Sequence, residues 1–149
     1  MTLTYVVTGE VERLLLPPQA ASARADELWR TTCFEAFIQG ADADAYLELN
    51  LAPSGKWAAY KFDSCREGMT PAALATSPKI HTLRGAEHFE LKAELDLGDF
   101  PASGLAWRVG LTAVIEETGG AKSYFALAHP AARPDFHDPR GFTLEIAPG

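Results

Sequence analysis

The chain has 149 residues and a formal net charge of −7, from 13 Lys and Arg against 20 Asp and Glu. Its 47% hydrophobic and 22% charged residues give the balance of a globular protein, which excludes a disordered acidic tail. The length predicts one domain over residues 1–149. The acidity argues against nucleic acid as a partner, because phosphate backbones are also negative. No apolar run approaches the roughly 20 residues that cross a bilayer, so no membrane partner is expected.

The first seven residues lack the basic and apolar regions of a secretory signal. The two cysteines, Cys33 and Cys65, stand outside any CxxC motif. Together these features predict a cytoplasmic protein with reduced, buried thiols, and a disulfide or a reactive thiol is the alternative.

Alternation with a period of two dominates the chain and predicts strands. In residues 89–97, Phe, Leu and Ala alternate with Glu, Lys and Asp. Short helical turns fit residues 19–28 and 70–76. Ten short strands predict an all-β fold, a single antiparallel β-sandwich of jelly-roll or immunoglobulin-like type. The predicted strands are, in chain order, residues 2–8, 10–16, 32–38, 45–51, 56–62, 78–84, 89–97, 105–115, 122–128 and 141–147.

Two of these strands carry an unusual polar face opposite their apolar one. Residues 32–38 and 45–51 are separated by a hairpin-length loop, and an in-register hairpin sets Glu35 beside Glu48 and Cys33 beside Asn50. Two carboxylates directly across a ladder repel each other, so a cation or a hydrogen-bond donor is expected over them. The candidate cations are Arg30, Lys61, Arg66 and Arg108.

The next strand adds Trp57 and Tyr60, which gives a face of carboxylates, amides and aromatic rings. This mixture suits a sugar, because carboxylates and amides bond to hydroxyls and rings stack on apolar C–H faces. A solvated outer face with routine charge pairs is the alternative.

A second polar group comes late in the chain, where His129, Asp135, His137 and Asp138 stand within ten residues. The group allows metal ligation, a loop fixed by side-chain hydrogen bonds, or contact with a ligand. Its spacing matches no zinc signature, so no metal site is predicted.

Four runs, at residues 28–38, 46–60, 62–69 and 129–142, resemble the bacterial DOMON-like domain proteins, relatives of the family-nine carbohydrate-binding modules. The resemblance implies a β-sandwich that binds a sugar or a haem. The sugar-binding relatives place a tryptophan six residues before a strand glutamate, then an Arg-x-Asn pair on the next strand. The resemblance carries this pattern onto Trp29, Glu35 and Asn50, whereas Glu48 puts an anion where those relatives have a cation.

The second stacking ring of those relatives has three candidates, which are Tyr124, Phe136 and Trp57. The haem-binding branch uses a methionine and a histidine as axial ligands, so the resemblance leaves open a pair of Met69 with His129 or His137.

The sequence therefore predicts a non-catalytic binding domain for a small polar ligand, with a carbohydrate or sugar conjugate as the first choice. No cofactor is expected, and a homo-oligomer stays open. A glycoside hydrolase using Glu35 and Glu48, a haem-binding module and a protein-interaction module are the alternatives. The predicted ligand-binding residues are Trp29, Glu35, Glu48, Asn50, Trp57, Arg66, His129, Asp135 and His137.

Overall fold

The computed structural model describes residues 1–98, 100 and 105–147. These residues form eleven strands and three single-turn 3-10 helices, which confirms the all-β prediction. None of the described helices is long and apolar enough to cross a membrane. The 3-10 helices are η1 (Val11–Arg13), η2 (Leu28–Arg30) and η3 (Pro139–Gly141). The strands are β1 (Thr2–Thr8), β2 (Ala23–Arg24), β3 (Cys33–Gly40), β4 (Tyr46–Leu51), β5 (Lys56–Phe62), β6 (Thr70–Pro71), β7 (Lys79–Arg84), β8 (His88–Glu94), β9 (Trp107–Glu116), β10 (Lys122–Ala126) and β11 (Leu144–Ile146).

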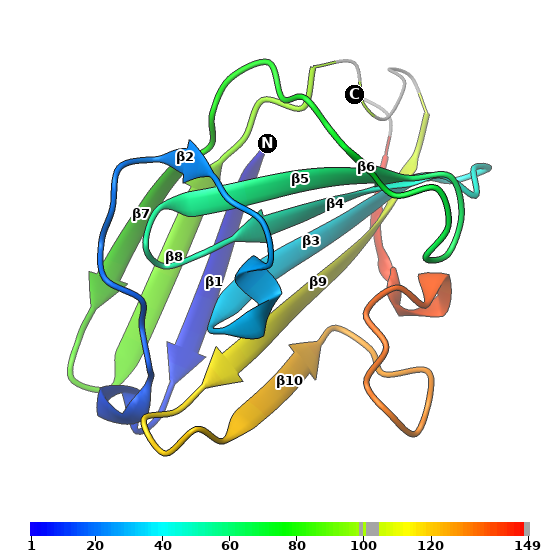
Figure 1. Cartoon of the computed structure of the whole chain (residues 1–149). Coiled ribbons are helices and arrows are strands. Elements are labelled where there is room, and N and C mark those ends of the chain that lie inside the picture. Colours follow the sequence, from blue (N-terminus) through cyan, green and yellow to red (C-terminus); the bar gives the residue numbers. More distant parts are fainter. Residues whose placement is uncertain (99, 101–104, 148–149) are drawn as a thin grey trace.

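The strands form two sheets. The smaller has the order β1-β8-β7, and the larger has the order β10-β9-β3-β4-β5-β2, with β11 paired to β9 and β6 paired to β5. In the larger sheet β2 runs parallel to β5, and the other pairs are antiparallel. In Figure 1 the larger sheet lies in front of β1, β7 and β8. Two layers of this kind are consistent with a β-sandwich.

The main core lies between the two sheets, on the faces that alternation predicts to be apolar. Phe89 and Leu91 of β8 are buried, and so are Phe34 of β3 and Leu49 of β4. The rings of Phe34 and Phe89 stack across the layers with centroids 6.0 Å apart. Burial of these side chains supplies the main favourable term in folding.

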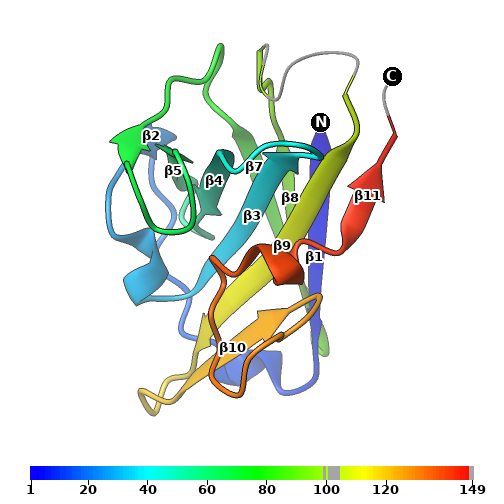
Figure 2. The ribbon, with the colours of Figure 1, turned by 90° about the vertical axis from the view of Figure 1, so that its right-hand side faces the viewer.

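The outer face of the larger sheet carries a second apolar cluster, which includes Phe37, Tyr46, Phe62 and Phe142. The segment between β10 and β11 lies over this face (orange to red in Figure 2). Gly110 of β9 permits its close approach, since a Cβ there would lie 2.7 Å from Cδ1 of Phe142. Every residue of β3 and β4 is therefore buried, on both faces of the sheet.

Three predicted elements differ from the structure. Residues 10–16 form η1 and one isolated bridge, because Val11 and Leu14, both buried, are three residues apart and need a turn to reach the same side. The helical turns expected over 19–28 and 70–76 are replaced by the two-residue strands β2 and β6. A strand of two residues is too short to show the alternation of apolar and polar residues that predicts a strand.

Candidate functional site

The observed register of β3 and β4 pairs Glu35 with Asn50 and Phe37 with Glu48. The predicted pairing of Glu35 with Glu48 is therefore wrong by two residues, because β3 continues to Gly40 and shortens the hairpin loop. A two-residue shift keeps every side chain on its face. Glu35, Glu48 and Asn50 still share the outer face, and the two carboxylates are diagonal neighbours, which lessens their repulsion.

Glu35 lies on the outer face of β3 with only 3% of its surface exposed. The hydroxyl of Thr112, on the neighbouring β9, donates to its Oε2 over 3.1 Å. Burial, and next the negative charge of Glu48, raise the pKa of Glu35 to about 8. The carboxyl group is therefore largely protonated at neutral pH.

Glu48 is supported from beneath by Asn50, which is completely buried. The amide Nδ2 of Asn50 donates to Glu48 Oε1 over 2.6 Å, and the thiol of Cys33 lies 3.7 Å from the amide oxygen of Asn50. Burial raises the pKa of Glu48, while the Asn50 amide and the Arg66 charge act in the opposite direction. Asn50 thus positions Glu48.

His137 lies over the sheet among aromatic rings. Its Nδ1 is 2.7 Å from the Tyr46 hydroxyl, and its Nε2 is 3.6 Å from Glu48 Oε2. Burial, and next the charge of Arg66, lower the pKa of His137 to about 4, so the ring is neutral at physiological pH. When the Tyr46 hydroxyl donates to Nδ1, the ring proton is on Nε2 and faces Glu48; this tautomer is an assignment from the hydrogen bonds.

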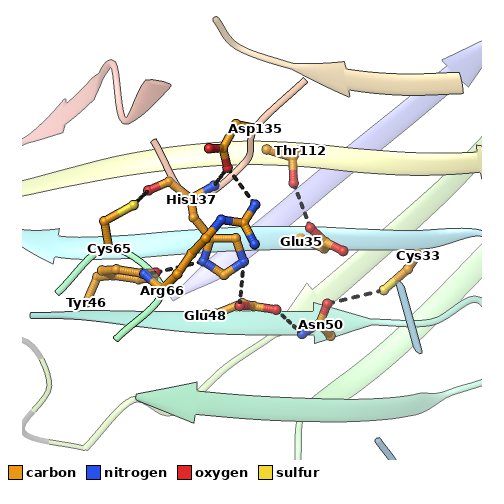
Figure 3. Close-up of polar contacts among 10 residues, drawn as sticks. All are labelled: Cys33, Glu35, Tyr46, Glu48, Asn50, Cys65, Arg66, Thr112, Asp135 and His137. Atoms are coloured by element: carbon orange, nitrogen blue, oxygen red, sulfur yellow. Dashed lines mark hydrogen bonds and ion pairs between the residues drawn. The ribbon is translucent and has the colours of Figure 1, made fainter. Parts of the chain in front are cut away.

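Two loops are joined over Glu48, one after β5 and one before η3. Arg66 Nη2 pairs with Asp135 Oδ1 at 2.7 Å, and the same oxygen accepts a hydrogen bond from the His137 amide over 3.1 Å. The Cys65 thiol donates to the carbonyl of His137 over 3.4 Å. Figure 3 shows these side chains above Glu48 and Asn50, with Glu35 and Thr112 alongside.

These residues border a pocket of ≈ 550 Å³. Its polar part is formed by two carboxyl groups from the sheet, one guanidinium and one imidazole. Its apolar part is formed mainly by aromatic rings from η2, β5, β10 and the segment before η3. The lining residues are Trp29, Glu35, Glu48, Phe62, Arg66, Met69, Val114, Tyr124, Pro134, Phe136 and His137.

The structure gathers five of the nine predicted site residues into the lining of this pocket. Two further ones support it: Asp135 holds Arg66, and Asn50 holds Glu48. Tyr124 and Phe136, two candidates for the second ring, also line the pocket. The five lining residues are Trp29, Glu35, Glu48, Arg66 and His137.

The remaining two predicted residues lie elsewhere. Trp57 pairs with Leu51 and belongs to the core between the sheets, so its placement on the ligand face is wrong. Trp57 and Tyr60 are three residues apart on one strand and must point to opposite faces. The ring of His129 contacts the pocket residue Phe136, with centroids 6.4 Å apart, and is not itself part of the lining.

Sequence reasoning missed three lining residues, Phe62, Val114 and Pro134, and it named Met69 only as a candidate haem ligand. Phe62 shares the face of Tyr60, and Val114 shares the face of Thr112, so alternation alone could have placed both. Met69 and Pro134 come from loops, where no period indicates a direction.

Within the described part of the chain, no group of three or more His, Cys, Asp and Glu side chains could hold a metal ion. Met69 and His137 both line the pocket, yet the two ring nitrogens of His137 face Tyr46 and Glu48. The ring is therefore not free to serve as an axial haem ligand.

Comparison with known proteins gives the fold and little else. No family model matches the sequence, and no curated protein matches it. The structure is similar to a crystal structure from Bacteroides uniformis described as a "putative carbohydrate-binding protein", with a TM-score of 0.69 and 17% sequence identity. The match covers 95% of this chain and 70% of that one. At this identity the likeness shows a shared all-β fold.

Proposed function

We propose that the chain is a single, non-catalytic domain that binds a carbohydrate or a sugar conjugate in the pocket beside Glu35. The observation that carries this proposal is that aromatic rings and buried carboxyl groups line the same pocket. Its ≈ 550 Å³ lies within the usual range for small-molecule sites. The description of the Bacteroides uniformis neighbour agrees with this reading.

The two parts of the pocket suit the two sides of a sugar. Trp29 and Tyr124 are 37% and 46% exposed, so their ring surfaces are open to the apolar C–H face of a pyranose. Glu48 accepts hydrogen bonds from hydroxyl groups, whereas the protonated carboxyl of Glu35 can also donate one.

The resemblance to DOMON-like proteins supports the same assignment. Trp29 and Glu35, which the resemblance marks as sugar-binding, line the pocket together. Asn50, the third residue so marked, acts in this proposal through Glu48, to which it is hydrogen-bonded. We therefore propose a DOMON-like sandwich with an altered sugar site.

The test is a titration of a sugar panel by calorimetry and by tryptophan fluorescence. The panel contains neutral hexoses and pentoses, uronic acids, amino sugars and their oligomers. We expect saturable binding of at least one class, lost in Trp29→Ala and in Glu35→Ala. Leu83→Ala, an exposed apolar position on β7, is the matched control and should bind like the wild type. A panel in which no sugar binds the wild type contradicts the proposal.

A second candidate, a glycoside hydrolase, is favoured by one observation. Two carboxyl groups share the pocket, and Glu35 has a pKa of about 8, as a general acid requires. Turnover of aryl glycosides that is lost in Glu35→Gln would establish it. Stable aryl glycosides in the presence of the wild-type protein would leave the carboxyl groups a binding role alone.

A further inference from the structure

The polar part of the pocket is short of positive charge. Two basic side chains line it, Arg66 and His137. The guanidinium of Arg66 is already paired with Asp135, and His137 is neutral. Glu35 and Glu48 therefore face a space in which the protein itself supplies one cation, and that cation has another anion as its partner.

Glu35 is the carboxyl group most affected by the lack of positive charge in the pocket. Its Oε2 has the neutral Thr112 hydroxyl as a donor, and its Oε1 has no hydrogen-bond partner among residues 1–98, 100 and 105–147. The charged group that acts on Glu35 is another acid, Glu48 of β4, which raises its pKa. Glu35 in turn raises the pKa of Tyr5 on β1 and of Cys33 on β3. The charge of Arg66 acts on Glu48 and His137. A nearly buried carboxyl group is thus aimed at the pocket without a cation.

The walls add a second property, which is affinity for cations. Trp29, Tyr124 and Phe136 line the pocket with aromatic rings, and Tyr124 and Phe136 have centroids 6.1 Å apart. The face of an aromatic ring attracts an ammonium group, most strongly where water is displaced. Rings and carboxyl groups on one pocket are therefore complementary to a ligand with a positive charge.

We infer that the pocket binds a ligand carrying an ammonium group and, if the proposed function holds, that this ligand is an amino sugar. The ammonium group lies beside Glu35 and Glu48, and the sugar ring lies against Trp29. That the ligand contains a sugar ring rests on the proposed function. That it carries an ammonium group rests on the charges of the side chains that line the pocket.

Binding of such a ligand moves one proton. The ammonium group keeps its own proton and favours the ionised form of Glu35, whose proton passes to the buffer. A neutral sugar leaves that proton in place. An N-acetylated sugar has no charge to pair with Glu35, and a uronic acid adds a further anion beside Glu48.

The experiment compares matched ligands by calorimetry at pH 7, with D-glucosamine, D-galactosamine, D-glucose, D-galactose, N-acetyl-D-glucosamine and cyclohexylamine as probes. We expect an amino sugar to bind about tenfold or more tightly than its neutral parent and its N-acetyl form. Titrations in phosphate and in Tris, which differ in ionisation enthalpy, should show release of up to about one proton per amino sugar bound.

Glutamine variants test the charge while keeping the shape. Glu35→Gln and Glu48→Gln retain an acceptor for Thr112 and for Asn50, so both are expected to fold, which circular dichroism checks. Each should lose most of the preference for the amino sugar, and Glu35→Gln should also abolish proton release. Glu145 is exposed on β11, outside the pocket. Glu145→Gln also removes one negative charge, and it should change neither the preference for the amino sugar nor the release of a proton.

The outcomes separate this inference from the proposed function. Equal affinity for amino sugar and neutral parent overturns the inference and leaves the proposed function in place. Cyclohexylamine binding as tightly as glucosamine, with no binding of neutral sugars, supports the ammonium site and overturns the sugar-binding function. Absence of binding by every probe overturns the inference, and absence of binding across the wider sugar panel overturns the proposed function as well.

Discussion

Glu35 couples the pocket to the stability of the protein through its proton. In the folded protein it holds the proton up to a pKa of about 8, whereas in the unfolded chain it loses it near the ordinary 4.5. The folded state therefore binds more protons than the unfolded state between these two values. Stability from this group is fully present below about pH 4.5 and is lost as pH rises through about 8.

The contribution of His137 to stability changes with pH in the opposite direction. Its pKa falls from 6.5 to about 4 on folding, so its contribution is present above pH 6.5 and is lost as pH falls through about 4. The two contributions cancel between about pH 4.5 and 6.5. Above that range His137 no longer offsets Glu35, and Glu48, whose pKa burial also raises, contributes with the same sign as Glu35.

We therefore predict that the free energy of unfolding falls between about pH 6.5 and 8, with a slope of up to about 1.4 kcal/mol per pH unit. Glu35→Gln should flatten this part of the profile because the amide does not titrate. Urea unfolding at a series of pH values measures both profiles. A variant that keeps the wild-type slope would show that Glu35 is not the group responsible.

Two tryptophans on opposite faces of the larger sheet allow stability and binding to be separated. Trp57 is 9% exposed within the main core, and Trp29 is 37% exposed at the pocket. Trp57→Ala should cost about 3–5 kcal/mol of unfolding free energy, and Trp29→Ala about 1 kcal/mol or less. Sugar affinity, in the conditions where Trp57→Ala is still folded, should be lost only in Trp29→Ala. Equal losses of stability would contradict this assignment of the two faces.

At the scale of the elements, β3 and β4 show what alternation can and cannot predict. The period of two correctly placed Glu35, Glu48 and Asn50 on one face. It could not fix the register, because a shift by two residues leaves every face unchanged. It also could not tell a solvated face from a covered one, since the segment that covers β3 and β4 is far away in the sequence.

The two loops that meet over Glu48 are joined by an exposed ion pair, Arg66 with Asp135. Exposed pairs contribute about 0–1 kcal/mol, so Asp135→Ala should change global stability little. It should, however, loosen residues 63–69 from the loop that carries His137, since the Cys65 thiol is then the remaining hydrogen-bond donor between them. We predict faster amide exchange in residues 63–69, with weaker sugar binding.

Asp138→Ala is the matched control for that variant. It also removes an Asp–Arg pair, with Arg140, and the hydrogen bond that Asp138 accepts at the start of η3. In Asp138→Ala, faster amide hydrogen exchange should be confined to the neighbourhood of residues 139–141. Hydrogen exchange followed by mass spectrometry distinguishes the two patterns, and unchanged exchange of residues 63–69 in Asp135→Ala would refute the role of the pair.

At the scale of the whole molecule, the sequence predicted the fold class, but it predicted only some of the residues that line the pocket. Turn residues and alternation indicate most of the strands because both signals are local. The pocket combines η2, the loop after β5, β10 and the segment before η3. Their meeting depends on tertiary packing. This is why Pro134 was missed and Met69 was named only as a haem ligand, while Trp29 was found through a family resemblance.

The net charge of −7 leads to a prediction about association rates. An acidic protein attracts a cationic ligand over a range set by the Debye length, which is about 30 Å at 0.01 M salt and about 3 Å at 1 M. Between these limits the association rate of an amino sugar should fall a few-fold, and that of a neutral sugar should stay nearly constant. Stopped-flow tryptophan fluorescence measures both, and equal salt dependence would argue against steering by charge.

The division of the pocket between sheet and loops makes it suitable for retargeting by design. Its acidic groups project from β3 and β4, each of which is paired with a strand on either side. Most of its rings belong to segments outside that ladder or at its margin. A library that randomises Trp29, Tyr124 and Phe136 can therefore search for new specificities while the scaffold keeps its backbone hydrogen bonds.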